Sequence, residues 1–253
     1  MQTSERINYI KKWILDYCKS MPKEAETLVV GISGGIDSSV TSTICALTGK
    51  KTIVLSMPIK QIKEQQNLSL KHQNWLKNKF KNVESHLINL DKLYQSFKIS
   101  LSEFDNDHGL ANSRARLRMT TLYQVAAANK GIVVGTGNKV EDFGVGFYTK
   151  YGDGGVDISP IADCTKTEVW ELGKELKIIK SLYFTSLASI PQKELDILML
   201  SFFSRPEIVG IYRMAKNFAI ALWALVDGIV LIIFPEIVNT VVLSSQSRSI
   251  LNS

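Results

Sequence analysis

The sequence predicts an α/β fold in which a mostly parallel sheet is flanked by helices. Short apolar runs alternate along the chain with longer amphipathic or polar stretches, and this alternation is typical of parallel strands joined by helices. The first apolar run ends in a glycine-rich turn, and a helical stretch follows it directly. An apolar run in this setting indicates a buried strand.

The first half of the alternation extends to residue 80. Residues 4–20 carry apolar side chains at helical spacing, which predicts an amphipathic helix. Residues 27–32 are the apolar run that enters the glycine turn, and residues 38–47 are the helix after it. A second short apolar run predicts a strand over 52–57, and the polar stretch 64–80 is a further helix candidate.

The second half repeats the same order. Residues 86–90 predict a third short strand, and residues 110–129 predict a helix with one apolar face. Residues 132–135 form another apolar run that ends in glycine, which indicates a buried strand. Residues 166–176 predict the helix that closes the series.

The composition limits the classes of function. The 253 residues fit one large domain or one domain with an appendage. The net charge of +6 favours anionic ligands such as nucleotides, but no Lys/Arg block is long enough to indicate a nucleic-acid partner. The three cysteines lack metal-site spacing, which argues against zinc and disulfides and is consistent with a reducing cytoplasm.

The composition changes near residue 181. We therefore predict an α/β domain over residues 1–180 and an apolar, helical or dimer-forming segment over residues 181–253. Residues 218–234 are almost wholly apolar but contain Asp227. Because this run is short for a bilayer span and a central aspartate is costly there, a buried or interface helix is favoured over membrane attachment. A membrane-associating segment and residues altered by a frame change are the other interpretations.

The strongest local signal is the glycine-serine loop between the first strand and the following helix. Small residues let backbone N–H groups approach a polyphosphate, and the helix N-terminus adds partial positive charge. Asp37 would repel phosphate unless it held Mg²⁺ against it. The alternative is a turn that only caps the helix. The predicted phosphate-binding residues are Gly31, Ile32, Ser33, Gly34, Gly35, Ile36, Asp37 and Ser38, with hydroxyl donation from the two serines.

Candidate ligand groups also occur further along the chain. Arg114 and Arg118 share one face of the helix expected over 110–129, whereas Arg116 lies roughly opposite. An arginine face can bind phosphate or carboxylate through paired hydrogen bonds, although a solvated basic face is the simpler interpretation.

The end of the fourth predicted strand adds further candidates. Thr136 falls at the carboxyl end of the sheet, where open α/β folds bind ligands. Glu141 can reach the same ion as Asp37. The glycine-rich stretch that follows suggests a ligand cover rather than an ordinary surface loop. Its charged residues are Lys150, Asp153 and Asp157.

These motifs together carry a family resemblance. The segment from Ser33 to Ser38 reads SGGIDS, and it resembles the PP-loop of ATP pyrophosphatases, which cleave ATP between its α and β phosphates. Three later stretches narrow the resemblance to ammonia-dependent NAD synthetases over residues 5–180. They read N-x-x-ARLRM, VVGT-x-N-x-x-E and TKYGDGGVDISPI, in that order.

The resemblance implies a doubly wound fold of the adenine nucleotide alpha hydrolase type and a homodimer. It implies that deamido-NAD (nicotinic acid adenine dinucleotide) is amidated with ATP and ammonia. The loop 31–38, Thr136 and Lys166 would contact ATP, and Asp37 and Glu141 would bind Mg²⁺. Asp37 and Lys166 would be the catalytic residues. The expected contacts of deamido-NAD are Arg116, Lys150 and Asp157.

Two features qualify these expectations. The loop begins by residue 31, so we expect no glutamine-using amidase domain before it and take ammonia as the nitrogen source. After residue 181 the substrate loop and the His-Lys pair of the family are not found. The alternatives are another PP-loop enzyme, such as a tRNA-modifying or GMP-forming one, and a nucleotide-binding protein impaired in catalysis by its diverged C-terminal segment.

Overall fold

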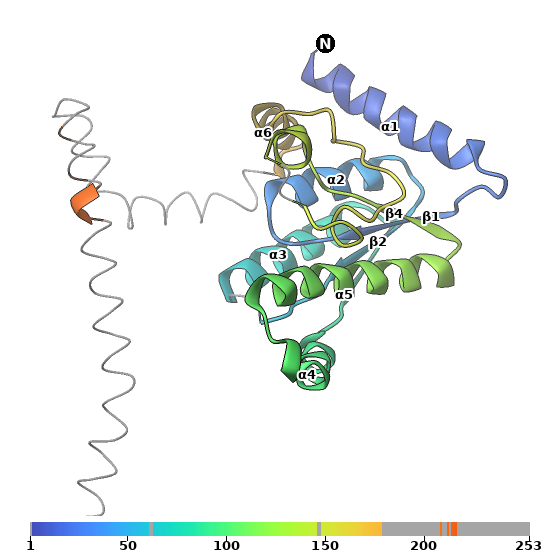
Figure 1. Ribbon diagram of the computed structural model, residues 1–253. Coiled ribbons are helices and arrows are strands. Elements are labelled where there is room, and N and C mark those ends of the chain that lie inside the picture. Colours follow the sequence, from blue (N-terminus) through green and yellow to red (C-terminus); the bar gives the residue numbers. More distant parts are fainter. Residues whose placement is uncertain are drawn as a thin grey trace, which may run out of the picture. The chain divides into compact units, whose positions relative to one another are not determined.

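The computed structural model describes residues 2–60, 63–145 and 148–178, together with 208, 212 and 214–216. The chain divides into two units, Met1–Phe184 and Thr185–Ser253, and the fold below is that of the first (Figure 1). Apart from the few positions just given, the predicted apolar segment 181–253, with its run at 218–234, lies outside the described residues. None of the helices described is long and apolar enough to cross a bilayer.

A parallel sheet of four strands forms the centre of the described domain (Figure 1). The strands are β1 (Thr27–Gly31), β2 (Lys51–Ser56), β3 (Val83–Leu87) and β4 (Gly131–Val134). Their spatial order is β3-β2-β1-β4. The chain therefore adds β2 and then β3 on one side of β1, and then crosses over to add β4 on the other side of β1. This reversal is the doubly wound arrangement, and ligands bind where the direction changes, at the carboxyl ends of β1 and β4.

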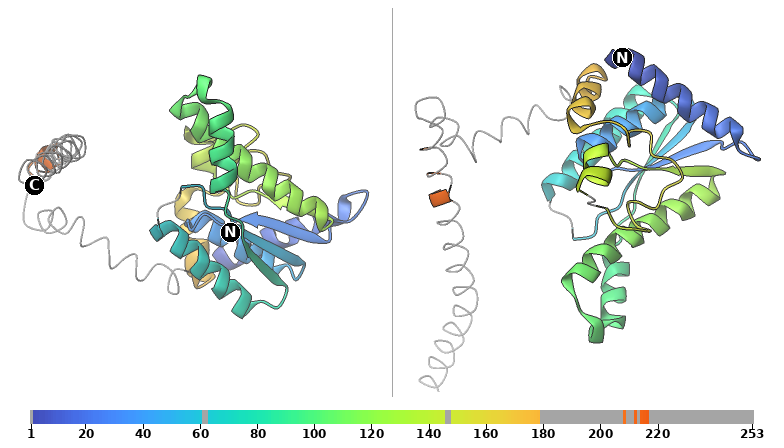
Figure 2. Two further views of the ribbon diagram at one scale, coloured as in Figure 1. Left: turned by 90° about the horizontal axis from the view of Figure 1, so that it is seen from below. Right: turned by 45° about the horizontal axis from the view of Figure 1, so that its top comes forward.

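Helices cover both faces of the sheet, as the three views in Figures 1 and 2 show. Buried side chains of α1, α2 and α6 pack on one face, together with Leu76 of α3, whereas α4 and α5 pack on the other. The bounds are α1 (Thr3–Ser20), α2 (Ile36–Leu47), α3 (Lys63–Lys79), α4 (Asp91–Ser100), α5 (Asp107–Ala128) and α6 (Lys166–Glu175), with short turns η1 (Ser102–Phe104) and η2 (Val140–Val145).

The continuous apolar strands follow from this two-sided burial. Leu28 and Val30 of β1 face the cluster under α1 and α2, whereas Val29 faces the cluster under α5. All three are 0% exposed. Since neighbouring strand residues point to opposite faces, a strand covered on both sides must be apolar at every position. The predicted fold class is confirmed.

One strand lies elsewhere than the sequence predicted. The expected strand 86–90 is β3, which spans Val83–Leu87, and Thr52 of β2 pairs with Val83. Ile88 and Leu90 follow the strand and pack with α4 and α5 instead. The apolar residues after β3 have the pattern of a buried strand, so the prediction was placed on them. Strand β3 itself is partly exposed at the sheet edge and lacks that pattern. Helix α4 was not predicted.

Candidate active site

The glycine-serine loop joins β1 to α2 at the carboxyl end of the sheet. Gly34 has a φ of 92°, a backbone conformation that glycine adopts without a steric penalty. Gly35 is the N-cap residue of α2. Ser33 and Gly35 are exposed, so the loop is open to a ligand where the dipole of α2 is positive.

The Ser38 side chain stabilises this loop by hydrogen bonds to its backbone. Ser38 is 1% exposed, and its hydroxyl donates to the Gly35 carbonyl at 3.0 Å and accepts from the Ser33 N–H at 3.3 Å. The Ser39 hydroxyl donates to the same carbonyl at 2.9 Å. The sequence suggested that Ser33 and Ser38 both offer hydroxyls to a ligand. In the structure Ser38 is buried and bonded within the loop, and Ser33 is the exposed one.

Asp37, Glu141 and Lys166 come together beside the loop. The Lys166 Nζ donates to Asp37 Oδ2 at 2.6 Å and to Glu141 Oε1 at 2.9 Å. Burial alone would lower the pKa of Lys166, but hydrogen bonds and the charges of the two carboxylates together raise it. The three residues come from the first turn of α2, from η2 and from the start of α6. The fold thus gathers them from three distant points of the chain.

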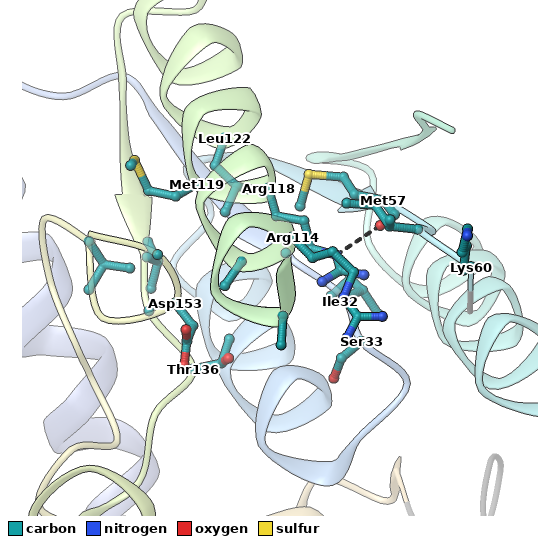
Figure 3. A pocket seen from close by; sticks show the side chains of 18 residues that line it. Ile32, Ser33, Met57, Lys60, Arg114, Arg118, Met119, Leu122, Thr136 and Asp153 are labelled. Carbon is teal, nitrogen blue, oxygen red and sulfur yellow. Dashed lines mark hydrogen bonds between the residues drawn. The ribbon is translucent and has the colours of Figure 1, made fainter. Parts of the chain in front are cut away.

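A cavity of about 520 Å³ opens next to the loop (Figure 3). This volume lies within the range of small-molecule sites. The cavity lies between the ends of β1 and β4, helix α5 and the glycine-rich loop. Its lining residues are Gly31, Ile32, Ser33, Met57, Ile59, Lys60, Ala111, Arg114, Ala115, Arg118, Met119, Leu122, Val134, Gly135, Thr136, Gly152, Asp153 and Val156.

Arg118 is fixed at the wall of this cavity (Figure 3). Its Nε donates to the Met57 carbonyl at 2.9 Å. Burial lowers the pKa of Arg118, and the nearby charge of Arg114 lowers it further. Two arginines, Lys60, Ser33, Thr136 and Asp153 supply polar groups to a lining that is otherwise largely apolar. Such a surface suits a ligand with a flat apolar part and charged groups.

Comparison with known proteins identifies the family. The sequence profile of NAD synthase matches residues 6–189. The chain belongs to the NAD synthase family. An NH3-dependent NAD(+) synthetase of Carboxydothermus hydrogenoformans is 37% identical over 177 residues, which are 68% of this chain and 70% of the relative. Other relatives of that name match over 58% to 75% of their own length.

Solved structures of similar chains agree with the fold. The structure of an NMN synthetase from Francisella tularensis has a TM-score of 0.66 and 34% identity, covering 72% of this chain and 74% of that one. An NH3-dependent NAD synthetase from Campylobacter jejuni, in complex with nitrate, has a TM-score of 0.63 and 28% identity. It covers 86% of this chain and 95% of that chain.

The three residues that the sequence predicted to contact deamido-NAD do not line the cavity. Arg116 is exposed on α5, while Arg114 and Arg118 of the same helix face the cavity. Lys150 is exposed, with its Nζ 5.1 Å from the centre of the Tyr151 ring. Neither side chain is therefore part of the cavity lining.

Asp157 fastens the glycine-rich loop to the domain. One oxygen accepts from the Val133 N–H at 2.7 Å, and the other accepts from the Tyr123 hydroxyl at 3.1 Å. Burial first, and then the charge and hydrogen bond of Asp157, raise the pKa of Tyr123 to about 12. Asp157 thus has a structural role in the chain, and Asp153 is the acidic residue of this loop that reaches the cavity.

The arrangement fits a magnesium ion that is shared with phosphates. Asp37 and Glu141 contact one and the same amine, so one cation can contact both. Among the residues described, no group of three or more His, Cys, Asp or Glu could hold a metal by itself. Mg²⁺ commonly takes one or two carboxylates and completes its oxygen shell with substrate phosphates and water.

Sequence reasoning missed several residues of the site. Met57, Lys60 and Asn138 received no role, and Arg118 was considered only as one of two arginines on a face that binds phosphate or carboxylate or is simply solvated. No motif marks Met57, because its contribution is a backbone carbonyl turned toward Arg118. Asn138 stands inside the GT-x-N-x-x-E stretch, and its position between Thr136 and Glu141 was the available signal.

Proposed function

We propose that this chain converts deamido-NAD to NAD with ATP and ammonia, through a deamido-NAD adenylate and with release of AMP and pyrophosphate. One observation carries the proposal: Asp37, Glu141 and Lys166 meet beside an open phosphate-binding loop in a chain of the NAD synthase family. The homologues named for this activity support it.

The chemistry explains why a nucleotide is needed. A carboxylate is a poor electrophile, because its leaving group would be oxide. In the proposed reaction the carboxylate oxygen bonds to the α phosphorus of ATP, and pyrophosphate leaves. Ammonia then attacks the acyl carbon, and AMP leaves with the electron pair of the broken C–O bond. No side-chain nucleophile is required, so the protein contributes positioning and charge stabilisation.

The described residues have distinct parts in this proposal. The adenosine portion of ATP would occupy the cavity beside Met57 and Leu122, and the phosphates would lie on the loop amides after Ser33. Lys166 would transfer its hydrogen bonds to phosphate oxygens, where its charge stabilises the departing pyrophosphate. Thr136 would contact ATP at the end of β4. Asp37 and Glu141 would hold Mg²⁺, which neutralises phosphate charge.

The contacts of deamido-NAD and the assembly of the protein are also proposals. Arg116, Lys150 and Asp157 resemble family positions that contact this substrate near a dimer interface. Arg116 and Lys150 are exposed and do not line the cavity, and a second subunit would be able to reach such exposed side chains. We therefore propose a homodimer, located in the cytoplasm with its substrates. The mass in solution, measured by light scattering, tests the dimer.

The similarity to an NMN synthetase favours one second candidate. NMN is the mononucleotide that corresponds to NAD, so its synthesis by amidation would start from nicotinic acid mononucleotide. The same activation chemistry would serve both acids, since each carries the reacting carboxylate on a pyridine ring. The two candidates differ only in whether the acid substrate carries an adenylate portion.

One assay tests both candidates. Purified protein is incubated with ammonia, Mg-ATP and either deamido-NAD or nicotinic acid mononucleotide, and nucleotides are resolved by chromatography. We expect NAD, AMP and pyrophosphate in equal amounts from deamido-NAD. A higher kcat/KM for the mononucleotide would replace NAD synthesis with NMN synthesis. No AMP from either acid would contradict the proposed function.

A further inference from the structure

Asn138 joins the two carboxylates of the candidate site from a completely buried position. Its side chain is 0% exposed. The Asn138 Nδ2 donates to Asp37 Oδ1 at 2.9 Å, and its Oδ1 accepts from the N–H groups of Val140 and Glu141, each at 3.1 Å. One amide thus bonds to a carboxylate of α2 and to the backbone that carries the other.

The chemistry of these partners fixes the orientation of the amide. Two backbone N–H groups can only donate, so the atom facing them must be the carbonyl oxygen of Asn138. The NH2 group then faces Asp37, which accepts. Only this orientation of the amide pairs each donor with an acceptor at all three contacts. A buried polar side chain without such partners would destabilise the fold.

The two halves of the amide have different effects. The acceptor half of the side chain, together with the bond from the Asp142 N–H to the main-chain carbonyl of Asn138 at 3.0 Å, holds the turn that begins at Val140 and presents Glu141. The donor half holds one oxygen of Asp37 and leaves the other oxygen, Oδ2, facing Lys166. Glu141 Oε1 faces the same amine. The amide therefore sets the direction of both carboxylates toward one point.

We propose that Asn138 is a positioning residue that aims Asp37 and Glu141 at a single divalent cation bound with ATP. This rests on the proposed function, in which those carboxylates share Mg²⁺. Some residues do not touch a metal but hydrogen-bond to its ligands and orient them. Removing such a residue typically lowers metal affinity by about 10- to 100-fold. A residue that only supports the fold would change stability and leave metal affinity as it was.

The test uses a variant that separates the two halves of the amide. Asn138→Ser keeps a short oxygen that can accept from N–H groups two and three residues ahead, but it cannot reach Asp37. Asn138→Ala removes both halves. Asn82→Ala is the matched control, because the Asn82 Nδ2 donates to the carbonyls of Ala46 and Lys50, at 2.9 and 2.7 Å, away from the site.

The readout is metal uptake without turnover. Free Mn²⁺ is followed by electron paramagnetic resonance in the presence of α,β-methylene-ATP, and thermal unfolding is recorded for each protein. We expect Asn138→Ser to unfold near the wild-type temperature and to need about 10-fold more Mn²⁺ for half-saturation. Asn138→Ala should need still more. Asn82→Ala should lose stability but keep the wild-type Mn²⁺ affinity.

The outcomes separate this inference from the proposed function. Wild-type Mn²⁺ affinity in Asn138→Ser would overturn the role of Asn138, and so would its failure to fold, since Asn138 would then be structural. Absence of NAD formation by the wild type, with Mn²⁺ uptake intact, would overturn NAD synthesis and leave the role of Asn138 standing. If the wild-type protein took up no Mn²⁺ with the analogue, both would fall.

Discussion

The Lys166 ammonium bonds to both carboxylates of the candidate site, and it is the cationic side chain we assign to the phosphates of ATP. Replacing it in Lys166→Met removes a charge that would stabilise the departing pyrophosphate. We expect kcat for AMP formation to fall by about 100- to 1000-fold, the range for loss of one stabilising donor. Steady-state pyrophosphate release measures this. Lys174→Met, at an exposed position of the same helix, should keep wild-type kcat, and an equal loss there would contradict the assignment.

Gly137 lies against the side chain of Asp142. A Cβ at this position would collide with the carboxyl group of Asp142, which follows Glu141 in the turn. In Gly137→Ala the Asp142 side chain must therefore turn away beside Glu141, which should lower the unfolding temperature slightly and raise the Mg²⁺ concentration needed for half-maximal rate. Gly144→Ala, where an added Cβ meets only atoms at 3.8 Å, is the control. Similar melting curves and Mg²⁺ requirements for both alanine variants would show that this close approach is unimportant.

Helix α6 begins at Lys166, and Thr165 is its N-cap residue. Thr165 and Glu168 form a capping box, in which the Thr165 hydroxyl accepts from the Glu168 N–H and the Glu168 carboxylate accepts from the Thr165 N–H at 2.7 Å. Glu168 also pairs with Arg6 of α1 at 2.9 Å. These contacts fix the helix end from which Lys166 extends toward Asp37.

The charge of Glu168 makes this end of α6 sensitive to pH. The backbone hydrogen bond from Thr165 lowers the pKa of Glu168 and outweighs burial, which raises it. The side-chain hydrogen bonds from Thr165 and Arg6 and the charge of Arg6 lower it further, so the pKa lies below its ordinary 4.5. A lowered pKa contributes stability above the unfolded value that is lost as pH falls through the folded value. Glu168→Gln keeps the cap but not the charge.

The wild type should therefore be more stable than Glu168→Gln near neutral pH by less than about 1 kcal/mol, since the carboxylate is partly exposed. That difference should shrink to nothing as pH falls below 4.5 and through the lowered pKa of the folded state. Urea unfolding of both proteins across this range measures it. A difference that stays constant down to low pH would mean that the charge of Glu168 does not contribute.

Element by element, burial decided which parts of the fold could be predicted. Strands β1, β2 and β4 are buried, so their apolar runs were unmistakable. Strand β3 contains Glu84, Ser85 and His86, and its place follows from pairing with β2 rather than from its own pattern. Helix α4 was missed because one side chain, Tyr94, is its only buried residue.

At the scale of the whole molecule, the sequence could predict which residues of the candidate site meet when those residues come soon after a strand. Asp37, Thr136 and Glu141 lie just after β1 and β4, and parallel strands that end at one edge bring such residues together. The cavity wall could not be predicted, because Arg118 is held by the main-chain carbonyl of Met57, and no side-chain pattern marks such a partner. Asn138 was missed although its position between Thr136 and Glu141 places it at the same edge of the sheet as Asp37, to which its amide donates.

Binding of Mg-ATP should stabilise the entire domain, because the proposed site draws on β1, β4, α2, α5, α6 and η2 together. A ligand present at about 100 times its Kd adds about 2.7 kcal/mol to the free energy of unfolding. For a chain of this size that corresponds to a rise of about 5–10 °C in Tm. Scanning fluorimetry with Mg-ATP measures the rise. ATP with excess chelator should give a smaller rise in Tm, since Asp37 and Glu141 then face the phosphates without a cation.

In Asp37→Asn, loss of one carboxylate should remove most of the difference in Tm that Mg²⁺ makes. A full Mg²⁺-dependent rise in that variant would place the metal away from Asp37 and break the link between the loop and the acidic pair.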